Sequence, residues 1–181
     1  MVPTNKKNNI EGGLIRKKSL GRHRLSQEGQ LLDHKSLRSV TGKTADWSEV
    51  AKDCIAFANA TGGKLLLGIE DGQDAPPADQ RIPSDLPDAI RRKIAERTVN
   101  VAVLPTVLTA PNGGQYVDLA IPRSIAVAST TDGRYLLRVA DQSKPVTGDD
   151  VLRLASERAT APVGKSDYAA SSPHQGRPGQ A

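Results

Sequence analysis

The sequence is poor in cysteine and in aromatic residues, and both shortages exclude classes of function. Cys54 is its single cysteine, so the chain can form no internal disulfide and no zinc site built on several cysteines. Only five of its 181 side chains are aromatic, too few for base stacking to be the main mode of nucleic-acid recognition. Cys54 lies on the apolar face of a predicted helix, where a small core residue is expected.

Long apolar runs are also lacking. No run reaches the length of a transmembrane helix, and no apolar segment follows the basic N-terminus as a signal peptide requires. We therefore expect a soluble protein with a cytoplasmic location.

Positive charge is present in excess and is unevenly distributed. The net charge is +5 and the isoelectric point is near 9.5, which favours anionic partners, nucleic acid before membrane. Residues 1–24 hold seven Lys and Arg against one Glu, and residues 159–181 are rich in Ala, Ser, Pro, Gly and Gln. We expect a disordered basic arm over 1–24, a folded domain over 25–158 and a disordered tail over 159–181. The arm either grips phosphates or only keeps the protein soluble.

The most informative stretch runs from Asp46 to Gly72. Asp46 and Glu49 form a capping box at the start of a helix whose apolar residues recur at helical spacing. Gly62-Gly63 ends that helix, and residues 64–69 form an apolar run that predicts a strand buried on both faces.

Further elements are predicted on either side of this stretch. Leu31 to Leu37 predicts a short strand, and Ser84 caps a second helix with Pro87 in its first turn. Two hairpins are expected, one between 107–110 and 115–121, the other between 125–128 and 134–139. Thr147 and Asp150 predict a capped final helix. This order predicts a single α+β domain with a mixed or antiparallel sheet and two to three packed helices.

One apparent phosphate-binding motif does not meet its own requirements. Thr41-Gly42-Lys43-Thr44 resembles the end of a P-loop, but Leu37 occupies the position where that motif needs a glycine. The segment is better interpreted as a solvated loop.

Four carboxylates flank the two predicted strands. If residues 31–37 and 64–69 are neighbours, their ends bring together a set that could hold a divalent metal against a phosphodiester: Glu28, Asp33, Glu70 and Asp71. The alternative is that they are ordinary solvated charges at strand ends.

Three segments resemble the Schlafen/AlbA-type DNA-binding domain. The central one is CIAFANATGGKLLLGIEDG, residues 54–72, similar to that family's signature of apolar helix, Gly-Gly turn, apolar strand and acidic pair. Residues 28–35 are similar to the family's opening Glu-x4-Glu-Phe-Lys. Residues 133–138, followed by 145–154, are similar to its Tyr-x-x-Arg strand and closing helix. The resemblance covers residues 26–157.

The resemblance implies a nucleic-acid-binding α+β domain. Some animal Schlafen proteins use it as a metal-dependent endoribonuclease, and their three acidic residues correspond to Glu28, Asp33 and Asp71, with Glu70 the alternative for the last. Mg²⁺ or Mn²⁺ would be the cofactor of that activity only. This sequence departs from the family pattern at three positions: Asp33 stands for Glu, His34 for an aromatic residue and Ala140 for a common Gly.

The leading hypothesis is therefore binding of nucleic acid, DNA before RNA, through phosphate contacts of weak sequence specificity. The expected contacts are Lys17, Lys18, Arg22, Arg24, Lys35, Lys43, Arg91, Arg92, Arg138 and Lys144. A metal-dependent endoribonuclease is the second hypothesis, and a regulatory protein-interaction module without nucleic-acid activity is the third. Further partners consistent with the sequence are a second copy of the chain, in a homo-oligomer, or a companion protein.

Overall fold

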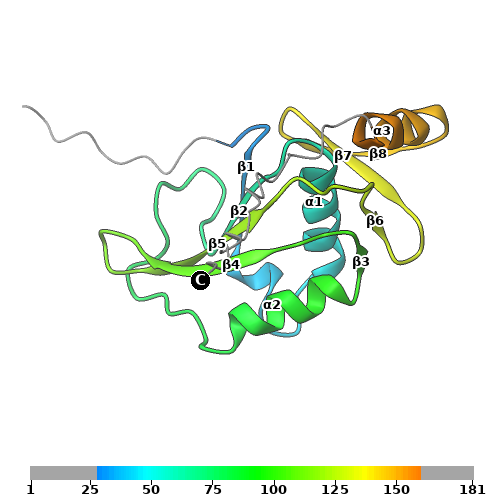
Figure 1. The fold of residues 1–181 in the computed structure, drawn as a ribbon. Helices are drawn as coiled ribbons and strands as arrows, with labels where there is room; N and C mark the ends of the chain where they lie inside the picture. The colour runs from blue at the N-terminus through cyan, green and yellow to red at the C-terminus, as the bar shows by residue number, and fades with distance from the viewer. Residues whose placement is uncertain (1–27, 160–181) are drawn as a thin grey trace, which may run out of the picture.

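The structure, a computed structural model, describes residues 28–159 (Figure 1). Its elements are β1 (Leu32–Lys35), the 3-10 helix η1 (Leu37–Ser39), α1 (Trp47–Asn59), β2 (Gly63–Leu67), α2 (Leu86–Ala95), β3 (Thr98–Val99), β4 (Leu104–Thr109), β5 (Gln115–Ile121), β6 (Ser129–Thr130), β7 (Tyr135–Val139), β8 (Gln142–Val146) and α3 (Asp149–Ala159). The predicted α+β class is confirmed.

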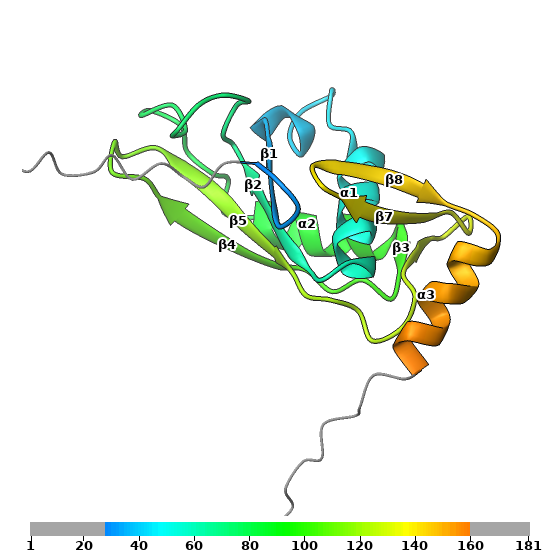
Figure 2. The ribbon, with the colours of Figure 1, turned by 90° about the horizontal axis from the view of Figure 1, so that it is seen from above.

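The main sheet has four strands in the order β1-β2-β5-β4. β1 and β2 run parallel, whereas β5 runs antiparallel to both β2 and β4, so the sheet is mixed as predicted. The parallel pair matters most for function, because the residues that follow β1 and β2 meet at one edge of the sheet. Figures 1 and 2 show α1 packed on one face of this sheet, with β7 and β8 on the far side of the helix.

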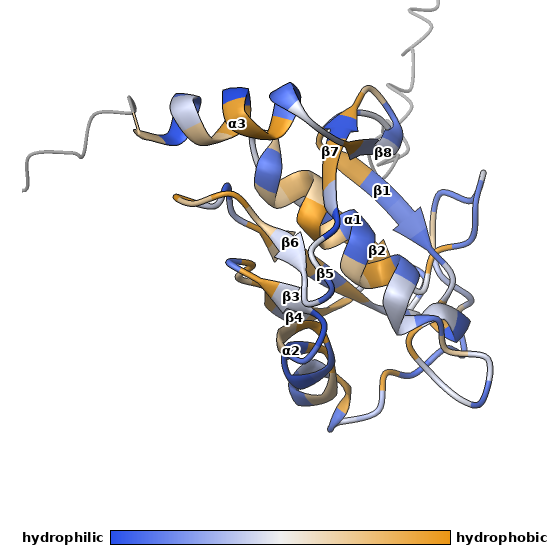
Figure 3. Cartoon of the chain, turned by 90° about the vertical axis from the view of Figure 1, so that its right-hand side faces the viewer, coloured by the Kyte–Doolittle hydropathy of each residue, from blue (hydrophilic) through white to orange (hydrophobic). Residues whose placement is uncertain are grey.

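Helix α1 is the centre of the core. The Asp46 carboxylate accepts a hydrogen bond from the Glu49 backbone N–H at 3.0 Å, which confirms Asp46 as the N-cap. Nine of its thirteen residues are buried, because the sheet covers one side and β7 and β8 cover another. Figure 3 shows its apolar turns in the interior of the domain.

The turn from α1 into β2 requires its two glycines. Gly62 has a φ of +83°, in the left-handed region, and its N–H donates to the Phe57 carbonyl at 3.0 Å. Gly63 has no space for a side chain, since a Cβ there would collide with the Phe57 ring. The pair therefore stops the helix and lets strand and helix pack closely.

Strand β2 is buried on both faces, as the continuous apolar run predicted. Leu65 and Leu67 pack against α1 in the larger cluster, while Leu66 and Ile69 belong to a second cluster with Tyr116 on the opposite face. The predicted first hairpin is β4–β5, with Val117, Leu119 and Ile121 in the core.

The second predicted hairpin is wrong. Residues 125–128 form no strand, and β6 pairs instead with β3, while β7 pairs with β8 through the turn at Ala140. The Asp132-Gly133 turn exists, but it joins β6 to β7 without a ladder between them. The apolar residues of 125–128 had suggested a strand; in the structure Ile125 is 94% exposed.

Helices α2 and α3 each bury only a few side chains. Helix α2 begins one residue later than predicted, with Asp85 rather than Ser84 as N-cap, and buries Leu86, Ile90 and Ile94. Helix α3 buries Leu154.

The predicted arm over 1–24 lies outside the described residues, as does the predicted tail apart from Ala159, which ends α3. No helix within residues 28–159 is both long and apolar enough to cross a membrane.

Candidate nucleic-acid interface

The predicted carboxylates are not gathered into one group: Glu70 and Asp71 follow β2, Asp33 lies within β1, and Glu28 precedes β1. Glu70 accepts a hydrogen bond from the Ser36 hydroxyl at 2.7 Å, so the two strand ends do meet there. Glu28 accepts instead from the backbone N–H of His34 at 3.1 Å. Asp71 is exposed. Across residues 28–159, no three His, Cys, Asp or Glu side chains are placed to hold a metal ion together.

Asp33 belongs to a buried ionic network. The Lys35 ammonium lies 3.1 Å from Asp33 Oδ2 and 3.3 Å from Asp53 Oδ2, and thereby bridges β1 and α1. The Ser143 hydroxyl donates to Asp53 Oδ1 at 2.7 Å and connects the network to β8. The carboxylate that stands where the family pattern has Glu is thus paired with a cation of the domain itself.

Arg138 closes the network from β7. Its guanidinium lies 3.6 Å from Asp33 Oδ2, donates to the Gly29 carbonyl at 3.2 Å and stacks on Phe57 with 4.7 Å to the ring centroid. The residue is 3% exposed. Arg138 was expected to contact phosphate at the surface; its burial makes it a structural cation that ties β7 to β1 and α1.

Opposing effects set the protonation of this network. Burial lowers the pKa of Lys35, but attraction by Asp53 and Asp33 outweighs it, and the pKa is raised above its ordinary value. Burial raises the pKa of Asp53, against the pull of Lys35 and the Ser143 hydrogen bond. Lys35 is therefore held as an ammonium between two carboxylates.

Sequence analysis missed Asp53. It lies three residues after Val50 and four before Phe57, so helical spacing puts it on the buried face of α1. A carboxylate in that place needs a buried cation as partner, and this was the available signal. Its partner Ser143 had no comparable signal, because β8 meets α1 only in the folded chain.

The expected phosphate contacts do not share one face. Lys43 lies in the loop before α1, Lys144 on β8, and Arg91 and Arg92 on α2, at the opposite end of the domain from β8 in Figure 1. Lys43 and Lys144 are exposed. Arg91 lies 2.7 Å from Asp88, and Arg92 lies 4.0 Å from Glu96. The remaining four, Lys17, Lys18, Arg22 and Arg24, lie outside the described residues.

Charge is segregated along the chain. Residues 28–159 contain sixteen Lys and Arg against eighteen Asp and Glu, a net charge of −2. The rest of the chain therefore carries +7. Within the domain, residues 70–88 hold six carboxylates and one arginine. That segment begins with Glu70 and Asp71 shortly after β2, and this end of the parallel strands is named the acidic edge.

A mixed sheet packed on one central helix, with an acidic edge where its parallel strands end, makes this a small α+β domain. The sequence profile of the family "Schlafen, AlbA_2" matches residues 28–147, and the chain belongs to this family. The resemblance drawn from the sequence is thereby confirmed.

Comparison with solved structures gives the same fold. One similar structure is the DIP2311 protein from Corynebacterium diphtheriae, with a TM-score of 0.51 and 22% sequence identity. The match covers 65% of this chain and 25% of that one, so the matched part of this chain spans about a quarter of the other protein's length. No curated protein matches the sequence.

Proposed function

We propose that this protein binds nucleic acid, DNA before RNA, through phosphate contacts that carry little sequence information. The observation that supports the proposal is membership of the Schlafen AlbA_2 family over residues 28–147, joined to a net charge of +5. Lys and Arg contacts to phosphate supply affinity and make it dependent on salt, without reading bases.

The charge distribution indicates which residues attract nucleic acid. Because residues 28–159 carry −2, most of the electrostatic attraction comes from the basic residues outside them, including Lys17, Lys18, Arg22 and Arg24. The domain adds the exposed Lys43 and Lys144. Arg91 and Arg92 also stay available, because ion pairs between exposed side chains are worth only about 0–1 kcal/mol.

Of the two remaining predicted contacts, Lys35 is kept as a secondary contact and the buried Arg138 is assigned to the network alone. The Lys35 side chain is 31% exposed and its charge is largely balanced by Asp33 and Asp53. We assign it chiefly to the network and only secondarily to phosphate.

Cleavage of RNA by Glu28, Asp33 and Asp71 is not proposed, since no contact in the described residues favours it over binding. Asp33 is already paired with Lys35 and Arg138. A catalytic Mg²⁺ or Mn²⁺ would have to be held by Glu28, Asp71 and Glu70, with Asp33 released from its cations.

A gel-shift series tests the proposal. The full chain is titrated into double-stranded DNA, single-stranded DNA and tRNA, each with and without Mn²⁺. We expect retardation of all three, strongest for double-stranded DNA, and weaker retardation by a chain lacking residues 1–24. Absence of retardation by the folded full chain would favour the protein-interaction module instead. RNA cleavage that needs Mn²⁺ and disappears in Asp71→Ala would add catalysis to binding.

A further inference from the structure

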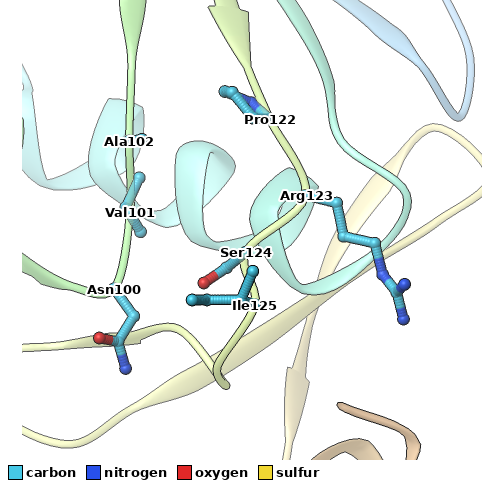
Figure 4. Close-up of a pocket in the computed structure, with 7 residues that line it drawn as sticks. All are labelled: Asn100, Val101, Ala102, Pro122, Arg123, Ser124 and Ile125. Carbon is cyan, nitrogen blue, oxygen red and sulfur yellow. The ribbon is translucent and has the colours of Figure 1, made fainter. Parts of the chain in front are cut away.

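Two adjoining pockets share one residue, Arg123, which follows β5. The first pocket, about 300 Å³, lies between the C-terminus of α1, β7 and α3. The second, about 390 Å³, lies between the segment after β3 and the segment after β5 (Figure 4). In Figure 4 the Arg123 side chain points away from Ser124 and Ile125, so it borders the second pocket without filling it. Neither pocket contains any of the residues predicted for nucleic-acid contact except Arg138.

The first pocket is rich in arginine. Four line it, Arg123, Arg138, Arg153 and Arg158, against one carboxylate, Glu157. This is the opposite end of the parallel strands from the acidic edge, because the pocket is also lined by Gln30 before β1 and by Thr61 before β2. An anion would approach it away from the carboxylates of residues 70–88.

The arginines of this pocket differ in how far their charges are balanced. Arg138 is balanced by Asp33, and Arg153 is held by Asp150 at 3.2 Å and by Glu157 at 3.1 Å. Arg123 has no ion pair to a described residue. Arg158 Nη2 donates hydrogen bonds to the carbonyls of Ala58 and Asn59, at 3.3 and 2.6 Å. The excess positive charge therefore belongs to Arg123 and Arg158.

Two observations indicate that the positive charge of this pocket is only partly balanced. Burial, and secondarily the neighbouring Arg123, lower the pKa of Arg158, and the attraction of Glu157 does not offset them. In addition, the Nε atoms of Arg138 and Arg158 are buried with no hydrogen-bond partner in the described chain. Arg138 lines this pocket and is 3% exposed, and its unsatisfied Nε adds to the unbalanced donors around it.

The second pocket is mainly apolar and carries a polar group at its rim. Ile125 is 94% exposed and lines this pocket together with Val101 and Pro122, so it offers an apolar surface to a ligand. Asn100, at a φ of +60°, donates through its amide to the Val127 carbonyl at 3.0 Å. Its amide oxygen is left to accept from a ligand.

We propose that the two pockets together bind one nucleotide, with a terminal phosphate against Arg123 and Arg158 and the base against Ile125 and Asn100. A phosphate group accepts several charge-assisted hydrogen bonds from guanidinium groups, and a base offers a flat apolar surface with polar edges. Each pocket has a volume at the lower end of the range of about 300–1,000 Å³ that is usual for small ligands. This function goes beyond the proposed contacts to backbone phosphates and does not depend on them.

Calorimetric titration of the full chain with adenosine monophosphate, adenosine and inorganic phosphate tests the proposal. We expect adenosine monophosphate to bind more tightly than either of its parts. Arg123→Gln should weaken it at least about tenfold, the usual effect of losing a charged hydrogen bond, and leave adenosine unchanged. Ile125→Ser should weaken adenosine monophosphate and adenosine several-fold and leave phosphate unchanged. The matched control is Arg134→Gln, an exposed arginine paired with Asp132 away from both pockets, which should bind like the wild type.

Equal affinity for adenosine monophosphate and adenosine would overturn the proposal, and so would no binding or an unchanged Arg123→Gln variant. A short oligonucleotide with and without a 5′-terminal phosphate distinguishes a free nucleotide from a strand end as ligand. If only the free nucleotide binds, the pocket serves a small molecule; if the phosphorylated strand also binds, it serves strand ends. Retardation of a duplex without terminal phosphates reports separately on the proposed backbone contacts, so either proposal can fail alone.

Discussion

The side chain of Asn59 makes two hydrogen bonds to the backbone of a single residue, Ala128. Its Nδ2 donates to the Ala128 carbonyl at 2.8 Å, and its Oδ1 accepts from the Ala128 N–H at 2.7 Å. Nδ2 also donates to the Leu136 carbonyl at 2.9 Å. Asn59 is buried, so these bonds anchor the segment before β6 and strand β7 to the end of α1.

Asn59→Asp should therefore destabilise the domain strongly. The change keeps the shape but replaces the donating amide by a carboxylate that faces two carbonyls, and a buried unsatisfied group costs about 1–3 kcal/mol, more when charged. We expect a loss of at least about 3 kcal/mol in chemical denaturation. Asn100→Asp, at an exposed position, should cost less than about 1 kcal/mol. Similar losses for both variants would contradict the role assigned to Asn59.

Ala140→Gly should stabilise the domain. Ala140 has a φ of +56° in the turn between β7 and β8, where a Cβ costs about 1–2 kcal/mol. Removing the Cβ relieves this strain, but glycine has greater freedom in the unfolded chain and offsets part of the effect. We therefore expect the free energy of unfolding to rise by about 1 kcal/mol. Ala102→Gly, at an exposed position without a positive φ, should lower stability. Thermal or urea denaturation should show the two changes with opposite signs.

His34→Phe should also stabilise the domain. His34 is 6% exposed, and its Nε2 is buried with no partner among the described residues. Phenylalanine keeps the approximate shape and removes the unsatisfied atom, and the Glu28 hydrogen bond to the backbone N–H is unaffected. We expect a gain of about 1–2 kcal/mol, and none for the polar control His34→Asn. The change also removes the contact of His34 Nδ1 with Glu28 Oε1, 3.8 Å in the structure, so a loss of stability in His34→Phe would show that this contact outweighs the unsatisfied Nε2.

The network predicts a specific dependence on pH. Burial raises the pKa of Asp53 in the folded protein above its ordinary value of 3.8, so the folded state takes up a proton at a higher pH than the unfolded state. The contribution of this group to stability therefore increases as the pH falls through that window. Relative to Asp53→Asn, the wild type should gain stability as the pH is lowered toward the ordinary carboxyl pKa of 3.8. A difference that is constant, or that moves the other way, would contradict the raised pKa.

Local features of this fold were predictable from sequence because they depend on neighbouring residues. The cap at Asp46, the Gly62-Gly63 stop and the buried strand β2 follow from spacing within a few residues. The pairing of β7 with β8, and of β6 with β3, depends on which distant segments meet, and the Asp132-Gly133 turn suggested the wrong partner. The burial of Arg138 was missed for the same reason, since Asp33 and Phe57 reach it from other elements.

The pockets around Arg123 were likewise invisible in the sequence. Arg123, Arg153 and Arg158 are spread over two segments that meet only at the end of α1. By contrast, the segregation of charge between the domain and the rest of the chain is already present in the sequence, because it depends only on composition along the chain.

The most direct test of nucleic-acid binding is the affinity of the full chain for double-stranded DNA, measured by fluorescence anisotropy over a series of salt concentrations. Each phosphate neutralised should add about 0.9 to the negative slope of log affinity against log salt concentration. We predict a steep slope for the full chain and a shallower one, with weaker binding, after deletion of residues 1–24. An affinity that does not change with salt would contradict binding through phosphate contacts. An unchanged slope after the deletion would show that residues 1–24 make no phosphate contacts.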